Sequence, residues 1–408
     1  MIRLSKFPFK TEKVAPKVSD NRSTSLLLQA GFIRQTMAWV YNYTTLWLKV
    51  LRKIENIVRK NMDNYWANEI LMSWISPKDV WDKTWRWDIE EYFKLPTYWD
   101  KYYRLNPTHE ELVVPLMKQF INSYKDLPTC VYQIQTKYRN EKRAKSWLLR
   151  WREFLMKDAY SFHLSDEDFQ KYYEWMIKVY KNIFDELGIW EDTYVTLADG
   201  GTFTDKYSHE FQTVLPIGED TIYICKNCGT SHNEEIIDPN NFVCTSCGGK
   251  DCDIKKASEV GNIFPLETKY SAPFELKVLN EEWKEQEVIM GCYGIWVSRL
   301  MWVIAEYFMK ENSIAWPENI APATHYIVVL GDNIEKAEQL AKYLESEGKE
   351  VILDDRQGKK FGFGAKMKDA ELLGIPNIII IWDKTIEQGG YELKKLWEKE
   401  GKLVKFSN

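Results

Sequence analysis

The segments VYQIQTKYRN at 131–140 and LLRWREFLMKDAYSFH at 148–163 carry the clearest structural pattern in this chain. Apolar and polar residues alternate in both, which predicts two strands at 130–141 and 152–163 joined by a short connection. The window 137–157 holds eight basic and two acidic residues. A run of charges is ordinarily a solvated surface, but arginines on a hairpin can converge on a polyphosphate, because guanidinium forks match phosphate oxygens.

The composition indicates a globular protein of more than one domain. The 408 residues are 45% hydrophobic and 28% charged, with a net charge of −5. No apolar run approaches the ~18 residues that span a bilayer, and the charged first residues lack the apolar core of a signal peptide. We therefore expect a cytoplasmic protein with no membrane partner. Any nucleic acid must be held by a local basic patch rather than by the global charge.

Four of the seven cysteines have the spacing of a zinc ribbon: Cys225, Cys228, Cys244 and Cys247 form C-x2-C, fifteen intervening residues, and C-x2-C. Disulfides or inert buried thiols are the alternative, but the absence of a secretion signal disfavours disulfides. Four sulfur ligands close the coordination shell, so a zinc here should be structural. Cys252 is a spare sulfur nearby and a weaker candidate.

Hydrophobic periodicity gives the other elements. Helices are expected at 46–62, 109–123, 165–188 and 297–309. Strands are expected at 288–295 and at 68–76, and the second of these is predicted to be buried. Beyond the linker at 317–322, strands at 325–330, 350–354 and 377–381 alternate with helices at 333–347, 366–373 and 391–399. That alternation predicts a small α/β domain with parallel strands.

The hairpin resembles motif 2 of the class II aminoacyl-tRNA synthetases, specifically the prolyl-tRNA synthetases of bacterial type. LNPTHEE at 105–111 is similar to the proline-recognition loop of that family, and MGCYGIWVSRL at 290–300 resembles its motif 3. The helix and strand at 45–76 resemble motif 1. DDRQGKKFGFGAKMKDAELLGIP at 354–376 resembles the anticodon-binding domain of the prolyl, threonyl, histidyl and glycyl enzymes. The resemblance covers essentially the whole chain except the cysteine segment.

The resemblance implies an α+β catalytic core, an antiparallel sheet with flanking helices, followed by a C-terminal α/β anticodon-binding domain. The expected division is catalytic at 1–220 with motifs 1 and 2, zinc ribbon at 221–257, catalytic again at 258–316 with motif 3, and anticodon-binding at 317–408. Bacterial-type members often carry a large editing insertion between motifs 2 and 3. Here that interval holds only the ribbon, so we expect no proofreading in cis.

The family's nucleotide-binding roles carry over residue by residue. Arg139 and Arg299 are the implied catalytic residues: Arg139 would stabilise charge on the α-phosphate and the attacking carboxylate, and Arg299 would cover one face of adenine. Phe154 would stack under the other face. Glu141 would accept from the adenine amino group, and Arg150 would hold the γ-phosphate. Mg²⁺ should bridge the phosphates, although its protein ligands are not identified by the sequence.

The remaining implied contacts are to proline and to tRNA. Thr108 and Glu110 match the pair that binds the proline α-amine, a cation that needs a carboxylate partner. The other implied contacts to proline are Arg139, Asp158, Tyr160 and Phe264, and the implied anticodon contacts are Arg356 and Lys366. The implied ligands and partners are ATP, L-proline, tRNA(Pro) and a second copy of the chain in a homodimer.

Tryptophan is abundant where the resemblance implies glycine. The chain has 18 tryptophans and 20 glycines, whereas a usage of ~7% would give about 29 glycines. Ten tryptophans stand at expected glycines: Trp39, Trp47, Trp66, Trp85, Trp99, Trp147, Trp151, Trp296, Trp302 and Trp382. Trp190 and Trp283 are further candidates, whereas Trp81, Trp87 and Trp316 fit true tryptophans. UGA codons that mean glycine in the host would explain this pattern. A tryptophan-rich, degenerate paralogue is the alternative.

Three functions therefore compete, and one of them, a synthetase for another amino acid of the same subclass, is disfavoured by the pair Thr108 and Glu110. The first is ATP-dependent activation of L-proline and its transfer to tRNA(Pro). The second is a catalytically impaired paralogue that binds tRNA or regulates, with a blocked adenosine site. The joint presence of the motif residues favours the first.

Overall fold

The computed structural model describes residues 1–14, 21–37, 40–98, 101–140 and 152–406. The chain forms two compact units: Ile54–Val303, and a second made of Met1–Lys53 together with Ile304–Asn408. Helices α2 (Thr45–Asn64) and α6 (Val297–Tyr307) run through the two boundaries between these units. The division of the sequence expected from the resemblance stays a prediction.

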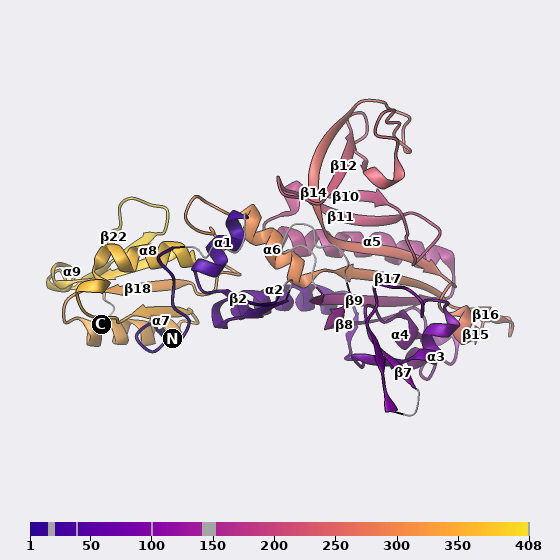
Figure 1. Ribbon diagram of the computed structural model, residues 1–408, viewed down its shortest axis with the longest axis horizontal. Helices are drawn as coiled ribbons and strands as arrows, with labels where there is room; N and C mark the ends of the chain where they lie inside the picture. The colour runs from indigo at the N-terminus through magenta and orange to yellow at the C-terminus, as the bar shows by residue number, and fades with distance from the viewer. Residues whose placement is uncertain (15–20, 38–39, 99–100, 141–151, 407–408) are drawn as a thin grey trace. The chain divides into compact units, whose positions relative to one another are not determined.

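A nine-stranded sheet organises the unit Ile54–Val303 (Figure 1). Most neighbouring strands are antiparallel, and the exceptions are the parallel pairs β10–β13 and β4–β8. In spatial order the strands are β11 (Ser208–Val214), β10 (Thr193–Ala198), β13 (Ser231–Asn233), β12 (Asp220–Cys225), β14 (Cys252–Glu267), β17 (Ile289–Ile295), β9 (Glu153–His163), β8 (Thr129–Tyr138) and β4 (Asn68–Glu69). Strand β11 also pairs with β14.

The expected hairpin is confirmed as β8 and β9, which pair from Thr129↔Phe162 to Tyr138↔Glu153. Helix α5 (Asp166–Glu186) follows and lies along one face of the sheet (Figure 1). The Ser165 hydroxyl accepts a hydrogen bond from the Asp168 backbone N–H and so caps the first turn of this helix, which begins where the sequence predicts. Every third or fourth residue of α5 is apolar, and these residues are buried against β9 and β17.

Smaller elements complete this unit. Helices α3 (Lys78–Lys83) and α4 (Glu110–Met117) adjoin a three-stranded sheet of β5 (Ile75–Pro77), β7 (Tyr102–Leu105) and β6 (Lys94–Pro96). Strands β15 (Lys277–Leu279) and β16 (Glu285–Glu287) form a separate hairpin. Short 3-10 helices lie at Tyr124–Asp126, Trp190–Asp192, Glu234–Ile236 and Ala272–Phe274.

The other unit contains a six-stranded sheet in the order β1 (Ile2–Arg3), β19 (Val351–Asp354), β18 (His325–Val329), β20 (Asn377–Ile381), β21 (Gly390–Lys395) and β22 (Lys402–Lys405). Its helices are α7 (Ile334–Ser346), α8 (Phe363–Leu373) and α9 (Asp383–Glu387), with a 3-10 turn at Lys359–Phe361. Helix α1 (Arg22–Gln29) and the hairpin of β2 (Ile33–Met37) and β3 (Val40–Tyr43) also belong to it. The first residues of the chain thus supply an edge strand to the C-terminal sheet.

The three strands predicted for this C-terminal sheet, β18, β19 and β20, are parallel as expected, but one predicted helix was wrong. Residues 391–399 were expected to form a helix, but Gly390–Lys395 is strand β21, antiparallel to β20. The helix-forming residues of this segment are overridden by pairing with the edge of β20, because backbone pairing outweighs weak local propensity. The sheet is consequently mixed: its first four strands are parallel, and β21 and β22 are antiparallel.

The predicted buried strand at 68–76 was also wrong. The segment forms two separated strands, β4 and β5, and its apolar residues Leu71 and Trp74 are exposed by 74% and 58%. The predicted helix at 109–123 is shorter and ends at Met117. In the described part of the chain, none of the helices has the length and apolar content needed to cross a membrane.

Candidate active site

The strand register places the predicted site residues on one face of the large sheet. Directly paired positions on neighbouring strands share a face, as do residues two apart on one strand. One row across the sheet consists of Gln133, Asp158, Gly294, Asn262 and Glu210. The row beside it consists of Val131, Tyr160, Cys292 and Phe264.

A cavity of about 270 Å³ opens on this face. It brings together five of the predicted residues, although they come from separate segments: Thr108, Glu110, Arg139, Asp158 and Phe264. Phe203, which sequence reasoning missed, also lines the cavity and stacks on Phe264 with ring centroids 4.7 Å apart. These two rings give the cavity an apolar wall beside the Glu110 carboxylate.

Glu110 lines the cavity and is fully buried. Its Oε2 accepts a hydrogen bond from the Thr108 hydroxyl, and its Oε1 accepts one from the Cys292 thiol at 3.2 Å. The Arg86 guanidinium lies 3.7 Å from Oε2 and makes its closer ion pair, 2.9 Å, with Glu111. Because the Arg86 guanidinium is shared with Glu111 and lies farther from Glu110, this buried carboxylate suits a cationic ligand, whose charge would complete the pair.

A buried network fixes the loop that carries Thr108 and Glu110. The Lys137 ammonium lies 2.7 Å from Asp158 and donates to His109 Nδ1 at 2.6 Å. Burial, and to a smaller degree the positive charge of Lys137, lowers the pKa of His109 to about 3, so the ring is neutral. Its Nε2–H donates to the Ser73 carbonyl at 2.9 Å. Tyr160 donates to Asp158 and accepts from the His109 backbone N–H. The network holds the loop against β8 and β9.

Trp296 occupies a slot between an aromatic ring and two guanidinium groups. Its ring stacks on Phe154 with centroids 4.7 Å apart and planes inclined by 28°. The Arg299 guanidinium lies 4.1 Å from the Trp296 ring centroid, and that of Arg139 lies 4.8 Å from it. Phe154 and Arg299 are the two residues expected to enclose adenine, so an indole fills the place implied for the base.

A carboxylate pair in the same cavity was not anticipated. Glu210 and Glu259 both line it, together with Asn262. Burial is the larger cause, and repulsion from the Glu259 carboxylate the smaller one, of a rise in the pKa of Glu210 to about 8. Glu259 in turn accepts from Arg299 at 3.1 Å. No sequence motif signalled the pair, because Glu210 and Glu259 lie on different strands and meet only through the pairing of β11 with β14.

Comparisons with known proteins agree with this geometry. Residues 93–308 match the family model "tRNA synthetase class II core domain (G, H, P, S and T)", and residues 324–408 match "Anticodon binding domain". The chain is 36% identical over 435 residues to the proline–tRNA ligase of Sulfurimonas denitrificans, covering 100% of this chain and 98% of that protein. The chain belongs to the prolyl-tRNA synthetase family.

Other members of the prolyl-tRNA synthetase family support the same assignment. A protein named as the probable mitochondrial proline–tRNA ligase of Schizosaccharomyces pombe is 37% identical over 383 residues, covering 91% of this chain and 88% of the relative. A Giardia lamblia prolyl-tRNA synthetase solved with prolyl-adenylate has the same fold, with a TM-score of 0.74 at 19% identity over 94% of this chain and 74% of the other. The expected class II core and anticodon domain are confirmed.

Some residues implied by the prolyl-tRNA synthetase resemblance are not in the cavity or not described. Glu141 and Arg150 lie outside the described residues, as do Trp39, Trp99, Trp147 and Trp151. Tyr160 is buried behind the recognition loop rather than lining the cavity. Its implied contact with proline stays a prediction.

The two predicted anticodon contacts of this synthetase-family chain have partners within their own domain. Lys366 is buried and donates to the carbonyls of Val329 and Asp354 at 2.6 and 2.9 Å. Arg356 forms ion pairs with Asp354 and Asp369. These bonds hold α8 and the 354–356 turn against β18, and a contact of either residue with RNA stays a prediction.

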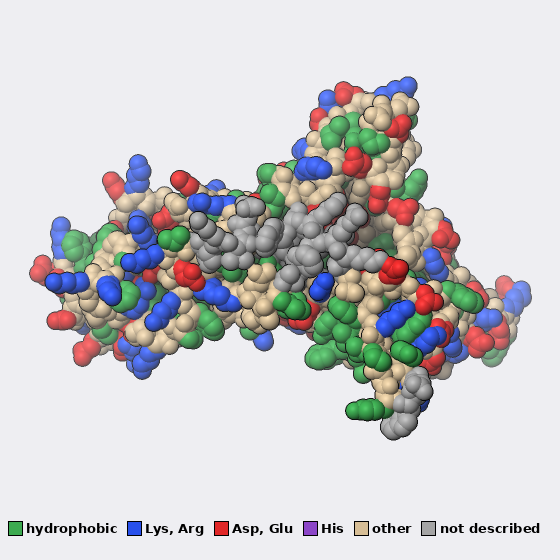
Figure 2. All heavy atoms as spheres, viewed as in Figure 1, with side chains coloured by type: hydrophobic (Ala, Val, Ile, Leu, Met, Phe, Trp, Pro, Cys, Tyr) green, Lys and Arg blue, Asp and Glu red, His purple; other side chains and the backbone are tan. Residues whose placement is uncertain are grey.

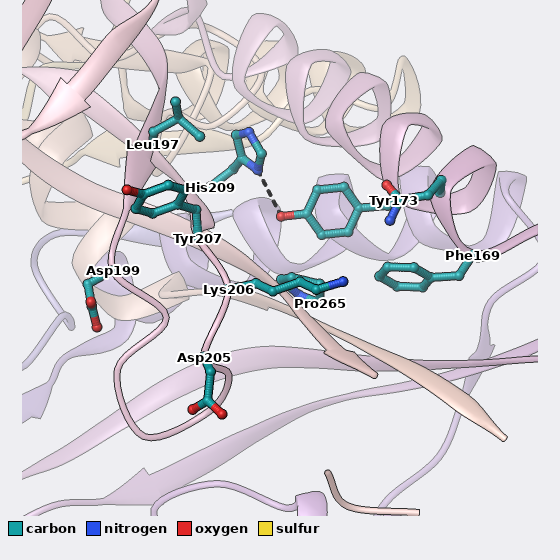
Figure 3. Close-up of a pocket in the computed structure, with 10 residues that line it drawn as sticks. Phe169, Tyr173, Leu197, Asp199, Asp205, Lys206, Tyr207, His209 and Pro265 are labelled. Carbon is teal, nitrogen blue, oxygen red and sulfur yellow. Dashed lines mark hydrogen bonds between the residues drawn. The ribbon is translucent and has the colours of Figure 1, made fainter. Parts of the chain in front are cut away.

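A second cavity of about 690 Å³ opens beside helix α5 (Figure 3). The hydroxyl of Tyr173 and Nδ1 of His209 are 2.9 Å apart at its wall, and that hydroxyl also donates to the Ile263 carbonyl. His209 lies on β11, so this hydrogen bond links β11 to helix α5. Asp199 lines both cavities.

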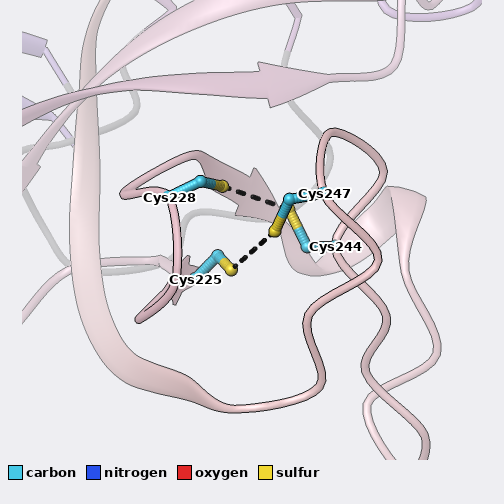
Figure 4. Close-up of side chains that lie close together, drawn as sticks. All are labelled: Cys225, Cys228, Cys244 and Cys247. Atoms are coloured by element: carbon cyan, nitrogen blue, oxygen red, sulfur yellow. Dashed lines mark hydrogen bonds between the residues drawn. The ribbon is translucent and has the colours of Figure 1, made fainter.

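The four ribbon cysteines converge on one point (Figure 4). Cys225 and Cys228 come from the end of β12 and the turn after it, and Cys244 and Cys247 from a second turn. The four sulfur atoms lie within 4.8 Å of one another. In each turn the N–H of a left-handed glycine, Gly229 or Gly248, donates to the carbonyl of the first cysteine. Cys252 is not part of the group.

Proposed function

We propose that this chain activates L-proline with ATP and transfers it to the 3′ end of tRNA(Pro) in the cytoplasm. The observation that carries the proposal is the convergence of Thr108, Glu110, Phe264 and Arg139 on one cavity. The cavity offers a carboxylate for the proline amine and an apolar wall for its ring. It also offers a guanidinium near the place expected for the α-phosphate.

The activation step forms one bond and breaks another. A proline carboxylate oxygen attacks the α-phosphorus of ATP, pyrophosphate leaves with the electrons of the broken P–O bond, and prolyl-adenylate remains. In this proposal Arg139 stabilises the negative charge that grows in the transition state, and Glu110 and Thr108, which are hydrogen-bonded to each other, orient the amine. The 3′-hydroxyl of the tRNA then attacks the activated carbonyl, and AMP leaves.

Glu210 and Glu259 are the groups we propose to hold Mg²⁺ at the phosphates. Burial first, and repulsion from Glu259 second, raise the pKa of Glu210, and a divalent cation between the two carboxylates would relieve that repulsion. A bound Mg²⁺ supplies charge neutralisation to the triphosphate. The pairing of Glu259 with Arg299 would keep that carboxylate turned toward the nucleotide.

We further propose that the chain acts as a homodimer through the segment 70–77. Leu71, Trp74 and Ile75 are exposed there by 74%, 58% and 47%. Hydrophobic side chains gather on the surface around β7 and β8 (Figure 2), and β5, which begins at Ile75, pairs with β7. An apolar patch of this kind is typical of a protein interface.

A second candidate function rests on Trp296. With the indole between Phe154 and Arg299, the chain as written has no room for adenine in that slot. Such a chain would act as a tRNA-binding or regulatory paralogue without adenylation. The choice between the two functions therefore depends on the residue at position 296.

Proline specificity is tested by ATP–pyrophosphate exchange, measured in a chain carrying glycine at the ten positions named above. Proline should stimulate exchange, whereas threonine and glycine should not. Glu110→Gln should raise the KM for proline by on the order of tenfold or more, because the amine loses its buried counter-charge, and should leave the KM for ATP nearly unchanged. The exposed Glu275→Gln is the matched control. Equal stimulation by several amino acids would refute the proline assignment.

The ribbon should bind one structural zinc per chain, since four thiolates fill a tetrahedral shell. Elemental analysis of protein expressed with zinc should find the metal, and Cys244→Ser should lose it and loosen the segment 221–257. Cys252→Ser is the control, because that sulfur lies outside the group, and it should keep its zinc. Protein that contains no metal after this expression would contradict the site.

A further inference from the structure

Three tryptophans have a backbone conformation that suits glycine. Trp66, Trp85 and Trp283 have φ angles of 59°, 59° and 60°, and their side chains are exposed by 83%, 92% and 83%. The left-handed region disfavours L-residues because Cβ approaches the following carbonyl oxygen, and the usual exceptions are asparagine and aspartate. Among the described residues the other left-handed positions are ten glycines and two glutamates.

Trp66 and Trp85 stand at the helix-end position that this chain elsewhere gives to glycine. After α2, the Trp66 N–H donates to the Asp63 carbonyl, and the next N–H donates to that of Met62. After α3, the Trp85 N–H donates to the Asp82 carbonyl, and the next N–H donates to that of Trp81. This pair of bonds is the Schellman motif, whose left-handed residue is usually glycine.

The chain provides its own reference for that motif. Helices α5 and α7 end in the same pair of hydrogen bonds, and there the left-handed residues are Gly188 and Gly348. The tryptophans make no compensating burial at these sites. Trp66 makes an edge contact with the Trp175 ring, at a centroid distance of 6.4 Å, and still remains 83% exposed.

Trp283 has the same left-handed backbone conformation, in the turn of a β-hairpin. The Asn280 N–H donates to the Lys284 carbonyl and the Trp283 N–H donates to the Asn280 carbonyl, which encloses a three-residue loop between β15 and β16. The last residue of such a loop is left-handed and is typically glycine.

We infer that the polypeptide made in the source cell carries glycine at positions 66, 85 and 283, and also at 296. The first three positions follow from backbone geometry alone. Position 296 follows from the occupied slot between Phe154 and Arg299, and it rests on the proposed function. A UGA codon that the host translates as glycine, but that the conceptual translation assigns to tryptophan, would give tryptophan at these four positions. In the same unit, Trp81 and Trp87 remain tryptophans: both are buried, and both rings contact the Arg104 guanidinium.

The test of backbone strain is the melting temperature of the unit Ile54–Val303 in the full chain. Trp66→Gly, Trp85→Gly and Trp283→Gly should each raise it, corresponding to an increase of about 2- to 5-fold in the folding equilibrium once the entropy of an added glycine is subtracted. Phe120→Gly is the matched control, since Phe120 lies in the same unit and is exposed by 65% without a left-handed backbone, and it should not raise the melting temperature. Three variants that melt no higher than this control would overturn the strain argument.

The identity of the residues is decided by peptides of the protein isolated from the source cell. Mass spectrometry should find glycine at 66, 85, 283 and 296 and tryptophan at 81 and 87, and the gene should have UGA codons at the first four and UGG at the last two. Tryptophan at all six positions would overturn the inference. Glycine at the first three with tryptophan at 296 would refute only the argument that rests on the adenine slot and on the proposed function.

Discussion

Trp296→Gly should create an ATP site in a chain that otherwise binds ATP poorly. The indole stacks on Phe154 and lies under Arg299, so it competes with adenine for both faces. A base stacked on an aromatic side chain gains ~1–3 kcal/mol, so vacating the slot should improve ATP affinity on the order of 10- to 100-fold. Equilibrium binding of ATP, measured by calorimetry on the full chain, reports the gain directly.

Two further variants separate the causes of that gain. Trp296→Ala also removes the indole and should recover most of the affinity if steric occupation is the main defect. Trp397→Gly removes an exposed tryptophan from the other unit and should leave ATP binding unchanged. An affinity for ATP that is the same in the chain as written and in Trp296→Gly would show that adenine binds elsewhere.

Arg139→Ala should abolish proline-dependent exchange in the chain that carries glycine at the ten positions. Arg139 lines the cavity beside Glu110 and donates to the Pro107 carbonyl, which places its guanidinium between the recognition loop and the nucleotide slot. Loss of a group that stabilises transition-state charge typically costs ~10²-fold or more in rate. The expected result is a collapse of kcat, because the charge that Arg139 stabilises grows only in the transition state.

The control for this variant is Arg52→Ala, which removes an exposed guanidinium on α2 and should preserve exchange. Arg139→Lys keeps the charge but loses the planar fork, so it should recover part of the rate. If Arg139→Ala raised only the KM for proline and left kcat intact, the residue would bind substrate without stabilising the transition state.

The hairpin, the α5 cap and the ribbon spacing were all accessible to sequence reasoning because each depends on neighbouring residues. The alternation in 130–138 and 153–163 decides which side chains share a face, and Ser165 caps its helix through an N–H three residues away. The strand at 390–395 could not be predicted in the same way. Its conformation depends on the free edge of β20, which the local sequence does not reveal.

The residues of the candidate site also fall into two groups, those identified from the sequence and those found only in the structure. The motif residues Thr108, Glu110, Arg139 and Phe264 were identified from the sequence, and the structure brings them to one cavity. Phe203 and the pair Glu210–Glu259 were missed, because their proximity arises from strand pairing and from a loop folded over the sheet. These residues were missed because they come close together only in the folded chain, and their spacing along the sequence does not reveal that proximity.

The sequence by itself determined the family, the motif residues, the cysteine spacing and the excess of tryptophan over expected glycine, since these are properties of residue identity and order. Only the tertiary structure decided where each tryptophan matters. Trp47 and Trp302 are buried in the core, Trp66, Trp85 and Trp283 sit at left-handed turns, and Trp296 fills the slot between Phe154 and Arg299. The same side chain has three different consequences because backbone conformation and enclosure are set by residues distant in the sequence.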